Sequence, residues 1–202
     1  MVRQDSQSDI HILNRAQQAF VDAFLELLHT KDFDNIHTTD IISGSGYSRG
    51  SFYYYYSDKY AFAQWLFDRE VDMLFQYISA FIVQHSLSEG QTYIQSSIEF
   101  YRHIYQNRLF FEAMQDKRFS MFSEEKFCFA IRDRLLENTR VEIPMWQEDF
   151  DMEFYSFLRC FEIIDIIRYW RCCDYRYSAE YIAQQSLYFT NNRTFSSISM
   201  VR

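Results

Sequence analysis

Apolar residues recur at three- and four-residue steps over most of the chain, which is the spacing of one face of an α-helix. The pattern predicts helices over residues 9–29, 58–85, 92–107 and 108–117, and a further helix that begins near Ser123. The chain also has only 4 Gly and 1 Pro, a shortage that argues against a turn-rich all-β fold. The sequence therefore predicts an all-α protein.

The last two predicted helices, 146–173 and 179–189, differ from the others in their pattern. In the first of them Phe154 and Phe161 belong to one apolar stripe while Leu158 lies off it, and a helix that is apolar on more than one side is buried on more than one side. The second burial is either intrachain or a subunit contact. We favour the subunit contact, because two such helices can form a four-helix dimer seam, and we expect a homodimer through about 146–189.

A different arrangement occupies residues 37–56, where two short helical patterns flank Gly46. Thr38 or Thr39 would cap the first helix, Gly46 would allow a sharp turn, and Ser48 would cap the second helix. This order predicts a helix-turn-helix, whose second helix enters the major groove of DNA with its leading residues at the base edges.

The leading residues of that second helix offer base-reading chemistry. Arg49 can bond guanine bidentately, Ser51 can bond a base edge or a phosphate, and Gly50 allows close backbone approach. Tyr53 follows on the same helix.

Phosphate contacts are expected from the hydroxyls of Tyr54 and Tyr55 and from the ammonium of Lys59. By burial statistics alone the tyrosine run 53–56 would more simply be a core helix. The Gly-x-Ser frame before it and Lys59 after it favour the DNA-binding interpretation.

Three segments in fixed order resemble the tetracycline-repressor (TetR) family of bacterial transcription regulators: AFVDAFLELLHTKDFDNIHTTDI, then GYSRGSFYYYY, then SDKY. The resemblance implies a helix-turn-helix domain over 1–58 with its motif at about 38–57 and an effector-binding and dimerisation domain over 59–190. The polar residues without periodicity that follow predict a flexible tail over 191–202. The resemblance also places Phe52 as a core anchor. Carried over by position, the DNA contacts that it implies are Thr38, Thr39, Ser48, Arg49, Gly50, Ser51, Tyr53, Tyr54, Tyr55 and Lys59.

The sequence departs from the family pattern in the first helix of the motif. Gly44 and Ser45 stand where a stronger helix former is usual, and each disfavours a helix by up to about 1 kcal/mol. Tyr47 replaces a usual Val, and Tyr56 a usual Phe. We expect a slightly looser motif with unchanged topology.

Charge conflicts with DNA binding. The chain has 20 Lys+Arg against 28 Asp+Glu, a net charge of −8, and residues 1–60 hold 5 Lys+Arg and 8 Asp+Glu, a net of −3, whereas DNA-binding domains are usually basic. DNA contact must therefore depend on about two cations and several hydroxyls, and we expect modest affinity without steep salt dependence.

Other kinds of site find little support. The histidines lack metal-ligand spacing, and we expect surface or capping roles for them and no metal or cofactor. The chain also lacks a phosphate loop, a dinucleotide fingerprint and a nucleophile with a base, so we expect no enzyme.

The absence of a long uncharged apolar stretch and the polar start predict a cytoplasmic protein without a membrane segment. We interpret Cys128, Cys160, Cys172 and Cys173 as reduced and mostly buried, with a soft-metal or redox role for the adjacent pair as the less favoured alternative.

An aromatic-rich effector cavity is the last candidate site. It would suit a planar or lipophilic ligand, including a cationic one that contacts ring faces. The same side chains could equally form solid core, because an aromatic stripe at helical spacing is more often packing. The candidate lining residues are Phe75, Tyr101, Tyr105, Phe110 and Met114.

Together these observations predict a homodimeric repressor that binds double-stranded DNA at a palindromic operator and releases it when an effector fills the C-terminal domain. The alternative is a helical regulator of the same fold that acts through a partner protein, with weak or no DNA binding. The acidic N-terminal domain motivates that alternative.

Overall fold

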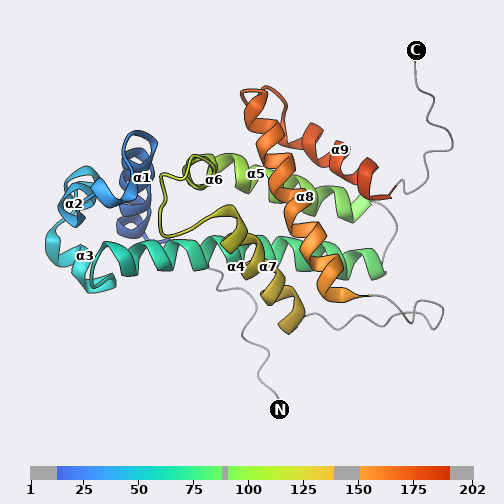
Figure 1. Ribbon diagram of the computed structural model, residues 1–202, viewed down its shortest axis with the longest axis horizontal. Helices are drawn as coiled ribbons and strands as arrows, with labels where there is room; N and C mark the ends of the chain where they lie inside the picture. The colour runs from blue at the N-terminus through green and yellow to red at the C-terminus, as the bar shows by residue number, and fades with distance from the viewer. Residues whose placement is uncertain (1–12, 88–90, 139–150, 192–202) are drawn as a thin grey trace.

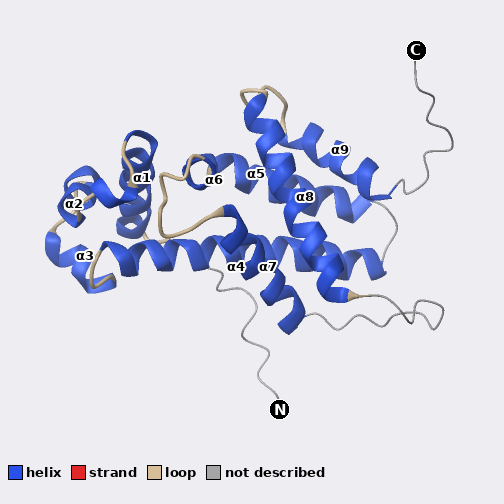
Figure 2. Cartoon of the chain, viewed as in Figure 1, coloured by secondary structure: helices blue, strands red, loops and turns tan. Residues whose placement is uncertain are grey.

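Within residues 13–87, 91–138 and 151–191, which a computed structural model describes, every regular element is a helix, so the predicted all-α fold is confirmed (Figure 2). Of the predicted tail over 191–202, Asn191 is instead the last residue of a helix, and residues 192–202 lie outside the described residues, as do the predicted helical residues 9–12 and 146–150. The elements are α1 (Arg15–Thr30), the 3-10 turn η1 (Phe33–Asn35), α2 (Thr38–Ser45), α3 (Arg49–Tyr55), α4 (Lys59–Leu87), α5 (Gln91–Gln106), α6 (Arg108–Gln115), α7 (Glu124–Asn138), α8 (Met152–Cys172) and α9 (Ala179–Asn191).

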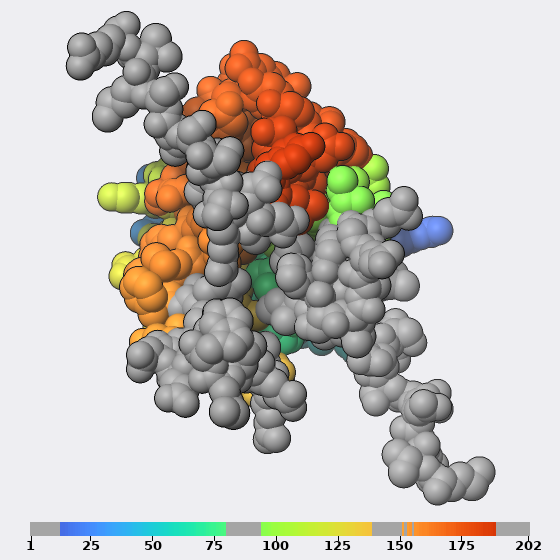
Figure 3. Space-filling model, turned by 90° about the vertical axis from the view of Figure 1, so that its right-hand side faces the viewer, coloured from blue at the N-terminus to red at the C-terminus, as the bar shows by residue number. Residues whose placement is uncertain are grey.

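Helix α4 connects the two ends of the molecule (Figure 1). Helices α1, α2 and α3 gather at one end, where α4 begins, and α8 and α9 lie towards the other end. Figure 3 shows α8, α9 and part of α5 together on the end face far from α1–α3. A displacement of α4 relative to its neighbours would therefore move the N-terminal helices relative to α8 and α9.

Side-chain caps fix several helix starts. The Ser123 hydroxyl accepts a hydrogen bond from the Lys126 amide at 3.2 Å, which confirms the predicted start of α7. Asp151 accepts from the Phe154 amide at 3.0 Å and caps α8. Asp58 accepts from the amides of Tyr60 and Ala61, each at 2.8 Å, and so caps α4 directly after α3.

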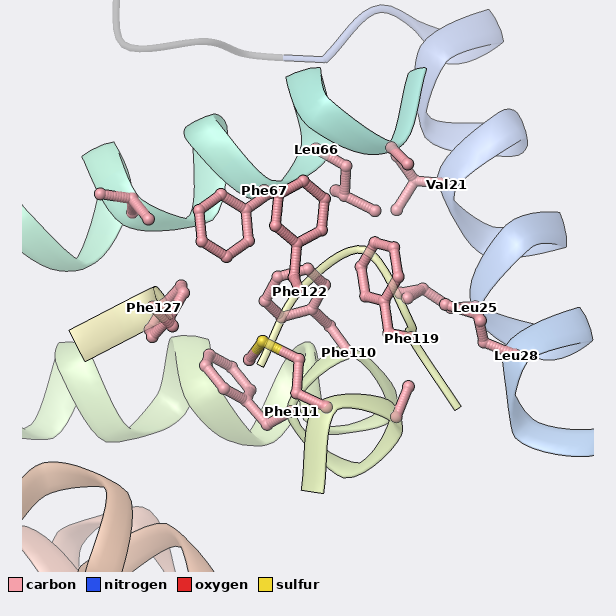
Figure 4. Close-up of a cluster of buried hydrophobic side chains, with 14 of the residues drawn as sticks. Val21, Leu25, Leu28, Leu66, Phe67, Phe110, Phe111, Phe119, Phe122 and Phe127 are labelled. Atoms are coloured by element: carbon pink, nitrogen blue, oxygen red, sulfur yellow. The ribbon is translucent and has the colours of Figure 1, made fainter. Parts of the chain in front are cut away.

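Aromatic side chains join the N-terminal helices to the rest of the molecule (Figure 4). Phe119 and Phe122 come from the connection between α6 and α7. The Phe119 ring lies 5.7 Å from that of Phe24 on α1, and the Phe122 ring stacks on Phe67 of α4 at 3.9 Å. Because these rings are buried, α1, α4 and the connection share one hydrophobic core.

Candidate nucleic-acid interface

The turn between α2 and α3 has the geometry that the sequence predicts. Gly46 adopts a left-handed conformation with φ of 71°, which glycine reaches without steric cost. The Ser45 hydroxyl donates to the Ile42 carbonyl at 2.8 Å and accepts from the Tyr47 amide at 3.2 Å. Ser45 therefore stabilises the turn, although its helix propensity is low.

The start of α2 differs from the prediction. The N-cap is His37, not Thr38 or Thr39, and the Asp40 carboxylate accepts from the His37 amide at 3.0 Å. The two threonines are the first residues of the helix itself, Thr38 half-buried and Thr39 exposed. An acidic residue three positions after the cap explains the difference, because it satisfies an amide that a threonine cap would leave free.

Gly44 corrects the expectation of a looser motif. A Cβ at this position would lie 3.1 Å from the Cβ of Ala23 on α1. The missing side chain therefore lets α2 pack closely on α1, and the low helix propensity of glycine accompanies a tight contact.

One face of helix α3 packs on the core, and the start of the helix is exposed to solvent. Ser48 caps it by accepting from the Ser51 amide at 3.1 Å, as predicted. Phe52 is fully buried and its ring meets that of Phe20 edge-on at 5.2 Å, which confirms it as the core anchor. Arg49 and Gly50 are exposed at the start of the helix.

The tyrosine run divides between solvent and the body of the domain. The side chain of Tyr54 is 81% exposed and Tyr53 is also open to solvent. The Tyr55 hydroxyl instead accepts a hydrogen bond from the side-chain Nδ2 atom of Asn14 at 3.1 Å, which links α3 to the N-cap of α1. Tyr56 is buried, and burial raises its pKa to about 12. Among the four hydroxyls, those of Tyr53 and Tyr54 are therefore best placed to reach DNA.

Lys59 is placed differently from the other candidate residues. Its side chain is only 8% exposed. The ammonium donates to the carbonyl oxygens of Ile36 at 2.7 Å, Phe33 at 2.9 Å and Asp34 at 3.4 Å, and lies 4.5 Å from the centre of the Phe33 ring. The predicted phosphate contact remains untested, but these three acceptors account for all three ammonium hydrogens.

The turn that Lys59 binds also contacts the connection between α6 and α7. The Phe33 amide donates to the Arg118 carbonyl at 2.7 Å, and the Ser120 hydroxyl donates to the Asp34 carboxylate at 3.0 Å. The Arg118 guanidinium donates to the His29 carbonyl at the end of α1. The end of α1 and the turn after it are thus hydrogen-bonded to the C-terminal part of the chain at one junction.

An ion pair extends this junction to α8. The Arg171 guanidinium holds both Asp116 oxygens at 2.8 Å, and Arg118 approaches the same carboxylate at 3.4 Å. The hydrogen bonds from Arg171 lower the pKa of Asp116 below its usual range. Sequence spacing gave no signal for this contact, because 55 residues separate its partners.

The electrostatics of the interface follow the sequence expectation only in part. Arg15, Lys31 and Arg49 are the exposed cations of the described residues up to 58. Asp22 and Glu26 are exposed on α1 rather than on α3. With Lys59 internal, fewer cations face outward than the sequence count suggests.

The five candidate effector-cavity residues differ in burial. Tyr101, Phe110 and Met114 are buried, Phe75 is half-buried and Tyr105 is exposed. The Phe110 ring contacts the ring of Phe111 at 5.4 Å, and the Tyr101 hydroxyl donates to Ser186 on α9 at 3.0 Å. The effector site stays a prediction.

A groove of about 560 Å³ lies instead between α8 and α9. Carboxylates of Glu162 and Asp165 line it together with the rings of Tyr169 and Tyr181. Burial raises the pKa of Glu162. None of the five predicted cavity residues lines this groove; its other lining residues are Ile166, Ile182, Gln185 and Ser186.

The cysteines and histidines correct two further expectations. Cys128 and Cys160 are buried free thiols, whose pKa values burial raises to about 12, but Cys172 is exposed and Cys173 half-buried. The expected surface or capping role fails for His103, which is buried against Glu70. In the described segments we find no group of three or more His, Cys, Asp or Glu side chains able to hold a metal ion. None of the helices in those segments has the length and hydrophobicity of a membrane span.

Comparisons with known proteins agree with this architecture. Residues 20–64 match the model of the family "Bacterial regulatory proteins, tetR family". A search of curated protein sequences finds no significant match.

Solved structures share the fold over most of their length. The dihydroxyacetone kinase operon activator DhaS is 16% identical, with a TM-score of 0.54 over 91% of this chain and 98% of that one. The fatty acid degradation regulator FadR from Bacillus halodurans is 10% identical, with a TM-score of 0.57 over 91% and 99%. A putative TetR-family regulator from Syntrophomonas wolfei is 18% identical, with a TM-score of 0.50 over 93% and 98%.

The capped helix-turn-helix, its exposed recognition helix and the helical C-terminal part define a DNA-binding transcriptional regulator. The match to the tetR family model lies in the helix-turn-helix region at residues 20–64, where the sequence resemblance places it.

Proposed function

We propose that the protein is a homodimeric repressor that binds a palindromic operator through α3 and leaves it when an effector binds the C-terminal helices. The exposed face of Arg49, Tyr53 and Tyr54 above the buried Phe52 carries this proposal. A rigid helix with an arginine and phenolic hydroxyls at its outer surface suits base and phosphate contacts in a major groove.

The dimer proposal rests on apolar side chains that the single chain leaves exposed on α8 and α9. Phe154 is 61% exposed and Leu158 is 46% exposed, although both occupy positions in a strongly apolar helix. Contiguous exposed apolar surface of this kind marks an interaction site. The other exposed residues of this set are Phe157, Tyr169, Tyr181 and Tyr188.

Dimerisation is tested by a charge placed in the proposed seam. We expect Leu158→Glu to shift the sedimenting species towards monomer at micromolar concentration. Leu136→Glu is a matched control, because Leu136 is also an exposed leucine but lies on α7. If both variants sediment like the wild type, α8 is not the subunit contact.

DNA binding is tested by footprinting on the DNA that flanks the protein's own gene. We expect a protected palindrome at physiological salt, and we expect Arg49→Ala to lose about 1 to 3 kcal/mol of discrimination at one base pair of each half-site. Arg176→Ala is the control, because this exposed arginine lies beyond the end of α8. A wild-type protein that protects no palindrome would contradict the proposal and favour action through a partner protein.

Effector release follows from linkage between the two sites. An effector that prefers a different separation of the recognition helices lowers operator affinity, and the operator must then lower effector affinity by the same factor. Calorimetric titration of a candidate lipophilic or aromatic ligand, with and without operator DNA, tests this reciprocity. Equal affinities in the two titrations would mean that the ligand does not regulate operator binding.

Repression, rather than activation, is tested by a reporter gene placed behind the protected palindrome. We expect higher reporter expression when the regulator is deleted. Lower expression on deletion would make the protein an activator with the same DNA interface.

A further inference from the structure

A carboxylate lies fully buried at the contact between α4 and α5. Glu70 on α4 is 0% exposed, and its Oε2 atom lies 2.7 Å from Nε2 of His103 on α5. Its Oε1 atom accepts from Arg69 Nη1 at 2.5 Å. Buried residues such as Val71 and Ile104 flank this group along the two helices, so charge is held in an otherwise apolar interface.

The histidine is itself constrained. The Asn107 side chain donates to the His103 carbonyl at 3.0 Å, which closes the end of α5, and the Tyr77 ring lies 5.7 Å from the imidazole. When Glu70 is ionised its carboxylate only accepts hydrogen bonds, so Nε2 of His103 is then the donor in this contact. The pair therefore has one favourable geometry.

Such a pair contributes more to the uniqueness of packing than to stability. Removing two charges from water costs about as much free energy as their attraction returns, and apolar replacements of similar volume are often equally stable or more stable. Apolar surfaces tolerate small shifts of one helix along another, whereas a buried hydrogen bond of fixed length and direction does not.

The position of the pair gives this constraint a functional consequence. Helix α4 begins at Lys59, directly after the recognition helix. Helix α5 is tied to α9 by the Tyr101 hydroxyl on Ser186 at 3.0 Å and by the Arg102 to Glu180 ion pair at 2.5 Å. The contact between Glu70 and His103 is thus a polar link between the recognition helix and the helices of the proposed dimer seam.

We propose that Glu70 and His103 are positioning residues that set the distance between the two recognition helices of the dimer, and thereby the half-site spacing that the protein accepts. This inference rests on the proposed homodimeric DNA binding. One inserted base pair moves a half-site by about 3.4 Å and turns it by about 35°, which a fixed dimer cannot follow.

The test uses the full-length dimer and a set of duplexes in which the same two half-sites, selected from random DNA, are separated by spacers that differ by one base pair. We expect the wild type to prefer one spacer at least tenfold. The variant Arg69→Met/Glu70→Met/His103→Leu replaces the whole group by apolar side chains. We expect its preference to fall below about threefold, while its urea midpoint stays equal or rises.

A second variant keeps the proposal open to refutation if the triple variant fails to fold. Glu70→Gln preserves shape but turns one acceptor into a donor that faces the donor of Arg69 or His103. We expect the spacer preference to fall at least threefold. Glu99→Gln is the matched control, because it removes an exposed carboxylate from α5, the helix of His103, and should leave the preference unchanged.

The outcomes separate this inference from the proposed function. A folded variant of either kind that keeps the wild-type spacer preference overturns the positioning role, as does a wild type that binds all spacers equally. A wild type that binds none of the palindromic duplexes overturns the proposed function itself.

Discussion

The ammonium of Lys59 donates to the carbonyl oxygen of Ile36 across 2.7 Å, and so fastens the first residue of α4 to the turn that follows α1. Two further carbonyls of the same turn accept from it. A buried cation at a helix N-terminus opposes the helix dipole, and these three acceptors offset that cost. The contact makes the start of α4 part of the DNA-binding domain.

We therefore predict that Lys59→Met acts on folding. Removal of the ammonium leaves the Phe33 and Ile36 carbonyls without this donor, at a cost of about 2 to 3 kcal/mol in the free energy of unfolding. Urea unfolding followed by circular dichroism measures it. Lys31→Met, at an exposed lysine, should change stability by less than about 0.5 kcal/mol. Unchanged stability with uniformly weaker DNA binding would instead assign Lys59 to a phosphate.

The glycines of the motif should respond in opposite ways. Gly44→Ala places a methyl group 3.1 Å from the Ala23 Cβ, an atom of a helix that cannot rotate away, and we expect a loss of stability despite the gain of helix propensity of about 1 kcal/mol. A Cβ at Gly50 meets only the Ser48 hydroxyl, at 3.7 Å. Gly50→Ala should therefore keep or raise stability and weaken operator binding.

Thermal unfolding and operator titration of both variants check this pair. Ala23→Gly added to Gly44→Ala should recover part of the loss, because it removes the opposing methyl group. Independent, additive effects of the two substitutions would contradict the proposed contact.

The sequence was sufficient for the helices and for the motif. Helical periodicity located the described helices, although α1 begins at Arg15 and α8 at Met152, later than the predicted starts at 9 and 146. Ser48 and Gly46 have the local roles that their residue types predict. These features depend on neighbours in the chain, where spacing alone carries the information.

Contacts between distant segments were beyond such reasoning. Lys59 was assigned to a phosphate because of its ammonium charge and the family resemblance, and no local pattern shows that the carbonyls 23 to 26 residues earlier point at it. The pairing of His103 with Glu70 spans 33 residues. The effector cavity stays a prediction for the same reason, since periodicity identifies an aromatic face but not whether another side chain fills it.

Salt dependence of operator binding tests the charge of the interface. If Arg49 and Arg15 of both subunits neutralise phosphates, four cations give a logarithmic slope of about −3.6. We expect a slope no steeper than about −4 between 50 and 200 mM salt, measured by fluorescence anisotropy. Arg176→Ala should leave it unchanged. A slope of about −8 to −10 would require many more phosphate contacts than the exposed cations of this domain provide.

The ion pair between Asp116 and Arg171 predicts a pH-dependent contribution to stability. Because hydrogen bonds from Arg171 lower the pKa of Asp116 in the folded protein, the pair stabilises the fold above the ordinary aspartate pKa of about 3.9 and loses this effect as pH falls through the lower, folded value. The carboxylate is partly exposed, so we expect Asp116→Asn to cost no more than about 1 kcal/mol at pH 7.

Urea unfolding of the wild type and Asp116→Asn from pH 7 down to pH 3 measures this effect. The difference between the two proteins should be constant near neutral pH and should shrink below about pH 4, where the wild-type carboxylate takes up a proton. Asp133→Asn is the control, since its exposed carboxylate pairs with the adjacent Arg132 and leaves the contact between α6 and α8 intact. A difference that persists undiminished at pH 3 would mean that Asp116 contributes through packing. The charge attraction between Asp116 and Arg171 would then not be what joins α8 to the junction at α1.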